Sequence, residues 1–237
     1  MMLYQGDCLD YLKECGQFDC IFADPPDNLG LDYSGFTDNN PKYYDWLELL
    51  IRLALDKCKV FWLSYYWEHD LEIKRRSYWI KPHWSKKTFI WRYTFGQHNN
   101  HDCGSGFRYI LRFARPDWVP NVKNIRTESE RQRLGDIRAN PNGRVPDDVW
   151  QFDSPNIWDE FPRVVGNSRE RRSWHVTQHP EGLMERIMRM SSTSNFLDCF
   201  VGSGTSFRVG KRINRDVTGC EISEAYCEQL RKEHNLT

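Results

Sequence analysis

The sequence predicts an α/β fold, a doubly wound and mostly parallel sheet of the Rossmann type with helices on both faces and a short loop-rich insertion. Three observations support this prediction. Short apolar runs alternate with stretches of helical periodicity along most of the chain. The runs Phe18–Ala23 and Asn195–Leu197 lead directly into loops rich in Asp, Pro and Gly. The 237 residues fit one such domain with a modest insertion. We expect residues 1–115 and 175–237 to form its two halves and residues 116–174 to form the insertion.

The elements of the first half follow from apolar runs and helix signals taken in order. Proline within the first turn favours the start of a helix at Pro41, and the apolar run after Lys57 favours a buried strand. The predicted elements are a short strand to Tyr4, strand Phe18–Ala23, helix Pro41–Lys57, strand Cys58–Ser64, helix Glu68–Arg76, strand Thr88–Trp91 and strand Tyr109–Ala114.

The second half resumes the alternation after a stretch with little periodicity. From Pro116 to Trp174, Pro, Asn, Gly and Asp interrupt the chain, which predicts loops with one short charged helix near Ser129–Leu134. The elements predicted after it are helix Pro180–Met190, strand Asn195–Cys199, helix Ser206–Ile213, strand Val217–Cys220 and helix Glu224–Glu233.

Two loops carry the strongest functional signal. Asp24-Pro25-Pro26-Asp27 and Asp198–Thr205 each leave the carboxyl end of a predicted buried strand, the edge at which open α/β sheets bind ligands. Asp-Pro-Pro makes a stiff turn that aims a carboxylate outward, whereas paired glycines let backbone N–H groups approach a cofactor. The first loop is therefore a candidate catalytic turn and the second a candidate cofactor loop.

These residues resemble the amino-methylating DNA methyltransferases in their permuted order, often called the β class. There an Asp-Pro-Pro-aromatic turn comes first, a target-recognition region follows and a Phe-x-Gly-x-Gly loop comes last. Three further segments extend the resemblance: Gly6–Cys8, His175–Leu183 and Gly219–Ser223. Any one segment would be weak evidence, but five in the same order are much stronger.

The resemblance implies transfer of a methyl group from S-adenosylmethionine to an exocyclic base amine. Asp24 would accept one amine proton and the carbonyl of Pro25 the other, in a turn completed by Pro26 and Asp27, on a flipped or unpaired base. The residues implied to bind the cofactor are Asp7, Cys8, Thr177, Gln178, Asp198, Phe200, Gly202, Ser203, Gly204, Thr205 and Glu221. Glu221 follows the glycine loop by about 20 residues, the usual spacing of a ribose-binding carboxylate. A nicotinamide fingerprint would need a third glycine where Phe207 stands.

Asp27 departs from the family pattern, which has an aromatic residue that stacks on the flipped base. Such stacking is worth about 1–3 kcal/mol. Three explanations are open: another ring supplies the platform, the substrate differs, or activity has been lost and only binding remains. We favour a substitute ring, and the candidates are Tyr33, Phe36, Tyr65 and Trp91.

Arginines dominate the cationic residues between Arg108 and Arg172, in a chain of zero formal net charge. Their planar forks suit phosphate or a guanine edge, so DNA is the expected partner. The candidate DNA-binding residues are Arg126, Arg131, Arg133, Arg138, Arg144, Arg169, Arg171 and Arg172. The alternative is a solvated face on which arginines pair with neighbouring carboxylates.

Cysteine usage and the absence of a long apolar run define the expected setting. The eight cysteines form no Cys-x-x-Cys pair, which indicates reduced core residues. His98–Cys103 lacks a second ligand pair at zinc spacing, so no metal is expected. We expect a monomer or homodimer without membrane association, cytoplasmic in a bacterial cell or phage-infected host.

The leading hypothesis is a DNA methyltransferase acting on adenine N6, with cytosine N4 as the nearest alternative. Asp at the first position of the turn is more typical of adenine enzymes, but Asp27 lies outside the pattern behind that preference. A catalytically silent DNA-binding protein with the same fold is the alternative from another class. The short insertion predicts modest sequence specificity, in a restriction-modification or viral setting.

Overall fold

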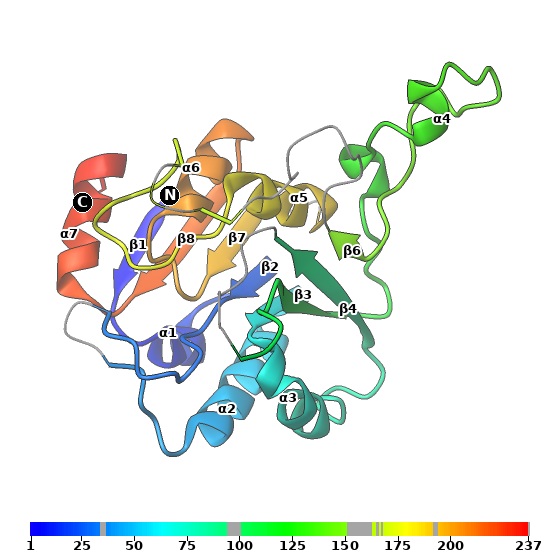
Figure 1. The fold of residues 1–237 in the computed structure, drawn as a ribbon. Helices are drawn as coiled ribbons and strands as arrows, with labels where there is room; N and C mark the ends of the chain where they lie inside the picture. Colours follow the sequence, from blue (N-terminus) through cyan, green and yellow to red (C-terminus); the bar gives the residue numbers. More distant parts are fainter. Residues whose placement is uncertain are drawn as a thin grey trace.

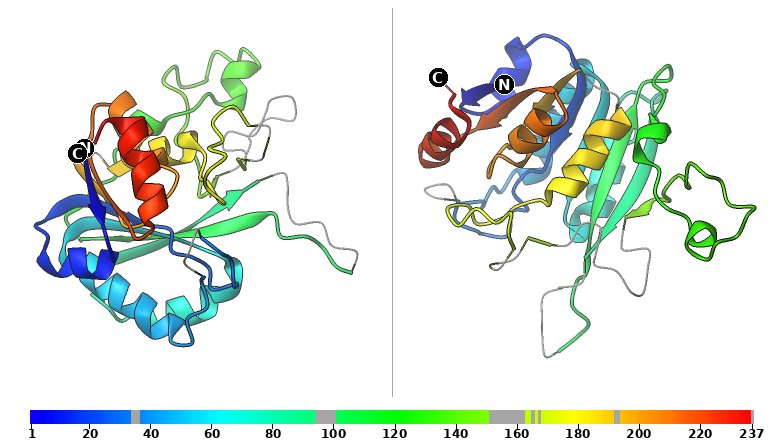
Figure 2. Two further views of the ribbon diagram at one scale, coloured as in Figure 1. Left: turned by 90° about the vertical axis from the view of Figure 1, so that its left-hand side faces the viewer. Right: turned by 90° about the horizontal axis from the view of Figure 1, so that it is seen from above.

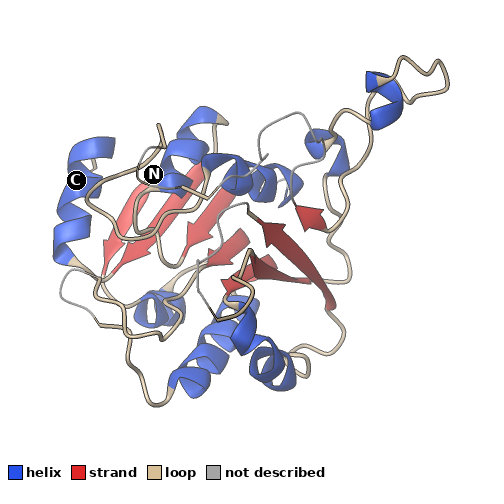
Figure 3. Ribbon diagram, in the orientation of Figure 1, coloured by secondary structure: helices blue, strands red, loops and turns tan. Residues whose placement is uncertain are grey.

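The computed structural model describes residues 1–33, 37–93, 101–150, 163–164, 166, 168–191 and 194–236. Its centre is an eight-stranded sheet of order β1-β8-β7-β2-β3-β5-β4-β6 (Figure 3). The strands are β1 (Met2–Gln5), β2 (Phe18–Ala23), β3 (Cys58–Tyr65), β4 (Ser85–Arg92), β5 (Phe107–Ala114), β6 (Val149–Trp150), β7 (Asn195–Asp198) and β8 (Asp216–Glu221). All neighbouring strands pair in parallel except those that flank β5. The mostly parallel α/β sheet predicted from the sequence is confirmed.

Helices cover both faces of this sheet (Figures 1 and 2). Helices α1 (Cys8–Glu14), α2 (Tyr43–Asp56) and α3 (Asp70–Ser77) pack on one face, and α5 (Glu181–Ser191), α6 (Thr205–Arg212) and α7 (Glu224–His234) pack on the other. Side chains along β3 point alternately to the two faces of the sheet. Phe61 and Leu63 pack into the core on the α2 side, whereas Val60 and Trp62 pack into the core on the α5 side. The sheet is therefore buried on both faces, as parallel sheets require.

The structure adds short elements that periodicity does not reveal. Helix α1 was not predicted, because seven residues make barely two turns; Asp7 caps it by accepting a hydrogen bond from the Leu9 amide at 2.8 Å. The predicted helix Glu68–Arg76 is a 3₁₀ turn, η1 (Trp67–His69), followed by α3. The predicted short charged helix is α4 (Glu130–Arg133). The predicted loop region also contains the 3₁₀ turn η2 (Val122–Ile125) and strand β6.

The segment around α4 projects from the body as an arm (Figures 1 and 2). An antiparallel bridge between Thr127 and Arg144 closes the base of this arm. Ser129 and Gln132 form a capping box at the start of α4. Local hydrogen bonds therefore order the arm without a core beneath it.

All eight cysteines are free, and Cys103 is the exposed one among them. No helix in the described ranges combines the length and apolar character needed to cross a membrane. Over the same ranges, no three His, Cys, Asp or Glu side chains converge as a metal site. His98 to Asn100 of the segment considered for metal binding lie outside the described residues.

Candidate active site

A cavity of about 650 Å³ opens at the carboxyl edge of the sheet, where both predicted loops meet. The catalytic turn after β2 forms one wall, and the glycine loop after β7 with the end of β8 forms another. All four residues of the turn and every residue predicted to bind the cofactor, except Gly204, line it. The sheet order thus brings together segments from both ends of the chain, as the motif pattern predicted.

The glycine loop needs glycine for conformation and for space. Gly202 and Gly204 have φ values of 46° and 77°, in the left-handed region that other residues rarely adopt. A Cβ at Gly202 would lie 2.7 Å from Nε2 of His175, so this loop packs directly on the segment after Arg172. Before the loop, the buried Asp198 carboxylate accepts a hydrogen bond from the Phe200 amide at 3.0 Å, and burial raises its pKa to about 7.

Glu221 at the end of β8 joins the glycine loop to the next helix. Its carboxylate accepts hydrogen bonds from the amides of Gly202 at 3.2 Å and Ser223 at 2.8 Å. Burial raises the pKa of Glu221 despite these contacts. The Ile222 amide also contacts this carboxylate, which leaves at least one acceptor site for a donor from the cavity.

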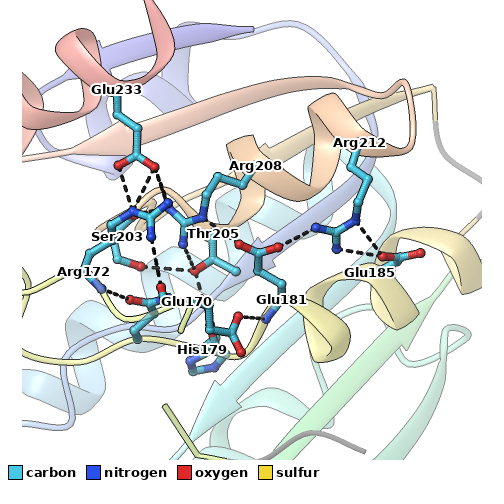
Figure 4. A network of polar contacts seen from close by, with 11 residues as sticks. Glu170, Arg172, His179, Glu181, Glu185, Ser203, Thr205, Arg208, Arg212 and Glu233 are labelled. Carbon is cyan, nitrogen blue, oxygen red and sulfur yellow. Dashed lines mark hydrogen bonds and ion pairs between the residues drawn. The ribbon is translucent and has the colours of Figure 1, made fainter. Parts of the chain in front are cut away.

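Arg208 supports the glycine loop from behind, within an ion-pair network drawn in Figure 4. Its guanidinium donates to the Ser203 carbonyl at 2.7 Å and to the Thr205 hydroxyl at 3.1 Å, and it pairs with Glu181 at 2.8 Å and Glu233 at 3.4 Å. The side chain is 11% exposed. This network was not predicted, because its members come from three separate segments.

Two residues of the sequence prediction take part in the same network. Arg172, predicted to contact DNA, instead pairs with Glu233 at 2.7 Å and ties its loop to α7 (Figure 4). Gln178 lines the cavity, but its amide accepts from the Arg172 backbone at 2.9 Å and donates to the Glu170 carbonyl at 2.7 Å. Both polar ends of Gln178 therefore hold the loop, whereas Thr177 beside it is exposed at the cavity.

The catalytic turn is clamped by Arg108 of β5, the central residue that the sequence prediction missed. Arg108 Nη1 donates to Asp27 Oδ2 at 2.6 Å, and Nη2 donates to Asp27 Oδ1 and to Asp24 Oδ1, both at 3.0 Å. The side chains of Arg108, Asp27 and Asp24 are 15%, 16% and 25% exposed. Burial alone would lower the pKa of Arg108, but the two carboxylates raise it well above its ordinary value. The sequence did carry one signal for Arg108. It lies two residues before Ile110, so its charge falls on the same face of β5 as an apolar side chain.

Asp27 is held from two further directions. Its side chain accepts from the Tyr66 amide at 3.2 Å. Its carbonyl accepts from Nε2 of His69 at 2.8 Å, and Nδ1 of His69 in turn accepts from the Tyr44 hydroxyl at 3.0 Å. Asp27 therefore serves as the anchor of Arg108 at the position where the family pattern has a ring.

His179 contacts the second oxygen of Asp24. Its Nδ1 lies 3.4 Å from Asp24 Oδ2, and its Nε2 lies 3.3 Å from the Ser64 hydroxyl. Burial lowers the pKa of His179, although Asp24 opposes this, which favours the neutral ring. Oδ2 of Asp24 thus faces a neutral ring, while Oδ1 carries the charged partner.

The structure places the candidate platform rings in different environments. Tyr33 and Trp91 line the cavity. Tyr65 is fully buried and its hydroxyl donates to Asp70 at 2.8 Å, so no base can stack on it and that candidate is corrected. Phe36 lies outside the described residues. Tyr66, which follows the last residue of β3 in extended backbone, does line the cavity, because consecutive side chains of extended backbone point to opposite faces.

The predicted DNA-binding arginines are spread over the arm and the loop before α5. On the arm, Arg131 and Arg133 are exposed, Arg138 pairs with Asp136 at 2.8 Å, and Arg126 donates to the Asn142 carbonyl at 3.0 Å. Arg144 lies 3.7 Å from Asp147, Arg171 donates to the Val176 carbonyl at 3.3 Å, and Arg169 is exposed. Pairing with carboxylates thus accounts for part of this set, as the solvated-face alternative expected.

Comparisons with known proteins show similarity to DNA methyltransferases along most of the chain. The family model described as DNA methylase, for N6 and N4 methyltransferases, matches residues 18–232. The Type II methyltransferase M.HpaI of Haemophilus parainfluenzae is 30% identical over 239 residues, which cover 92% of this chain and 68% of that protein. DNA adenine methyltransferase YhdJ of Escherichia coli is 29% identical over 248 residues, which cover 94% of this chain and 79% of that protein. The crystal structure of an M1.HpyAVI–SAM complex shares the fold, with a TM-score of 0.59 at 18% identity and 98% of both chains covered.

Proposed function

Because the chain belongs to the N6/N4 DNA methylase family, we propose that it transfers a methyl group from S-adenosylmethionine to adenine N6 in DNA. Cytosine N4 is the alternative target. One observation carries the proposal: the Asp24–Asp27 turn and the loop containing Gly202, backed by Glu221, open into the same cavity. The Asp at the start of the turn and the similarity to an adenine methyltransferase favour adenine.

The residues around the cavity fit the cofactor. Glu221 keeps acceptor capacity for a ribose hydroxyl, and Asp7 and Cys8 line the adjoining wall, where the adenine ring would lie. The exposed Thr177 and the Gly202–Ser203 backbone would border the methionine part. The bound cofactor would supply a sulfonium methyl group as the electrophile.

The chain's own groups would handle the amine. An exocyclic amine is a poor nucleophile because its lone pair is delocalised into the ring, so the enzyme must orient the nitrogen and accept its protons. Oδ2 of Asp24, which faces the neutral His179, would accept one N–H, and the rigid carbonyl of Pro25 would accept the other. A paired base cannot reach this turn, so the target must be flipped or unpaired.

Transfer of tritiated methyl from S-adenosylmethionine to unmethylated DNA, followed by mass spectrometry of the nucleosides, tests the activity and the target base together. We expect N6-methyladenine from the wild type and a loss of at least about 100-fold in rate with Asp24→Ala. N4-methylcytosine would identify the alternative base. DNA that shifts in a gel but gains no label with any substrate would identify a silent binding protein and refute the proposal.

Target recognition is proposed for residues 116–174, with the two flanking segments as the catalytic and cofactor-binding halves. The arm carries the exposed Arg131 and Arg133, which would contact phosphates and confer affinity without reading sequence. We therefore expect a short or loosely defined site. Sequencing of methylated bases tests this, and one long palindromic motif would contradict it.

A further inference from the structure

Asp27, at the sequence position where the family pattern has its stacking ring, lines the cavity together with Arg108. The two side chains form a forked pair, with Nη1 2.6 Å and Nη2 3.0 Å from separate oxygens of Asp27. A fork of this kind is planar and fixes the orientation of the guanidinium. The pair thus presents a flat, rigid group in the wall of the cavity.

The remaining contacts of Arg108 also engage the edge of its guanidinium. Nε donates to the Ser64 hydroxyl at 3.3 Å, and Nη2 also donates to Asp24 at 3.0 Å. Together with the two contacts to Asp27, four hydrogen bonds engage Nε, Nη1 and Nη2 at the edge of the guanidinium. The side chain is 15% exposed and lines the cavity, and with its edge engaged, the face is the part that a base would contact.

The rings near this pair are less well placed to serve as the platform. Trp91 is 3% exposed, and its ring lies 5.1 Å from that of His179. Tyr93 lies under the Arg163 guanidinium at 5.6 Å. Tyr33 and Tyr66 line the cavity, whereas Arg108 lines it and also contacts the carboxylate that would accept the amine proton.

We propose that the guanidinium plane of Arg108, held flat by Asp27, is the surface on which the target base stacks. This rests on the proposed function. Bases stack on guanidinium planes as they do on aromatic rings, and the positive charge attracts the electron-rich face of a purine. Because Arg108 also holds Asp24, stacking would set the base at a fixed height relative to the accepting oxygen. The aspartate at position 27 is then required to hold this platform in place, and the absence of an aromatic ring at that position is explained.

The test compares three duplexes that carry the site methylated by the wild-type enzyme, and each lacks the partner base opposite the target, so that no unpairing energy enters the comparison. The target position holds adenine, a benzimidazole isostere that stacks but lacks the hydrogen-bonding edge, or an abasic residue. Affinities are measured by fluorescence anisotropy in S-adenosylhomocysteine for the wild type, Arg108→Lys, Tyr33→Leu and Tyr66→Leu. Each preference is a ratio within one variant, so partial loss of folded protein cancels.

We expect the wild type, Tyr33→Leu and Tyr66→Leu to bind adenine and the isostere about 5- to 150-fold more tightly than the abasic duplex. Arg108→Lys keeps the charge but has no plane, and its ratio should fall below about threefold. A double variant, Asp27→Tyr with Arg108→Leu, restores a ring and should recover the preference. The proposal is overturned if Arg108→Lys keeps the preference ratio, or if either tyrosine variant loses it. It is also overturned if the wild type binds the isostere duplex no more tightly than the abasic duplex. A wild type that methylates DNA without any base preference overturns this proposal alone, whereas one that methylates nothing overturns the proposed function as well.

Discussion

Replacing Asp27 with Asn should destabilise the protein measurably, because one carboxylate holds together three parts of the site. The Asn side chain keeps the shape of Asp27 and one acceptor oxygen, but it removes the negative charge. It also replaces the oxygen contacted by Arg108 Nη1 at 2.6 Å, or that contacted by Nη2 at 3.0 Å, with an NH₂ group. The contact from the Tyr66 amide at 3.2 Å survives only in one orientation of the amide.

The magnitude follows from what remains around Arg108. Removing one partner of a buried pair costs about 3–5 kcal/mol when the other charge is left uncompensated. Here Asp24 still contacts Nη2 at 3.0 Å, and the side chains are 15–25% exposed, so the loss should be smaller. Hydrogen bonds to charged groups contribute about 1.5–3 kcal/mol each, and partial compensation places the expected loss at about 1–3 kcal/mol.

Urea unfolding followed by circular dichroism measures this free energy, and a protein of this size should lose about 2–4 °C in Tm for each kcal/mol. Asp10→Asn removes an exposed partner of Lys13 and serves as the control, with no measurable change expected. In a double-mutant cycle with Arg108→Met, the two sites should couple by about 0.5–3 kcal/mol. Strict additivity, or a loss no greater than in the control, would refute the assigned role of Asp27.

Three further substitutions test the walls of the site. Burial raises the folded-state pKa of Asp198 from 3.8 to about 7, so its stabilising contribution is complete below pH 3.8 and declines as pH rises to 7. Asp198→Asn should remove this decline, which is about 1.4 kcal/mol of unfolding free energy per pH unit when measured by urea titration at several pH values. If the variant and the wild type lose stability in parallel as pH rises, the prediction is contradicted. Gly202→Ala forces a Cβ to within 2.7 Å of a histidine in left-handed backbone and should cost about 1–3 kcal/mol of unfolding free energy, whereas Gly16→Ala, with nothing within 4 Å, should not. Arg208→Met should weaken the rise in Tm caused by S-adenosylmethionine, because Arg208 supports the glycine loop. Arg52→Met, which breaks an exposed helical pair, should preserve that rise. An equal rise in Tm for the two variants would show that the glycine loop does not need Arg208.

Much of the sheet and both loops could be predicted because their signals are local. The strand Phe18–Ala23 matches β2 at both ends, and the adjoining Asp-Pro-Pro turn lies where an apolar run ends. Short or isolated elements were missed for the same reason: α1 and β6 contain too few residues to show a period.

Sequence reasoning is weakest where a single position decides which side of the chain a side chain points to. Tyr65 and Tyr66 are equivalent as aromatic residues after a strand, yet only Tyr66 reaches the cavity. Arg172 likewise belongs to an arginine-rich segment, and only its approach to Glu233 distinguishes it from a residue free to meet DNA. Composition carries no information on either choice.

The sequence by itself determined the α/β class, the family and the two loops that meet at the cavity, because each depends on consecutive residues. Only the tertiary structure decided what Asp27 does. Its partner Arg108 lies 81 positions away, and the sheet order β2-β3-β5 brings the two together across an intervening strand. An ion pair of this kind depends on strand pairing, register and burial, and the residues flanking either partner encode none of these.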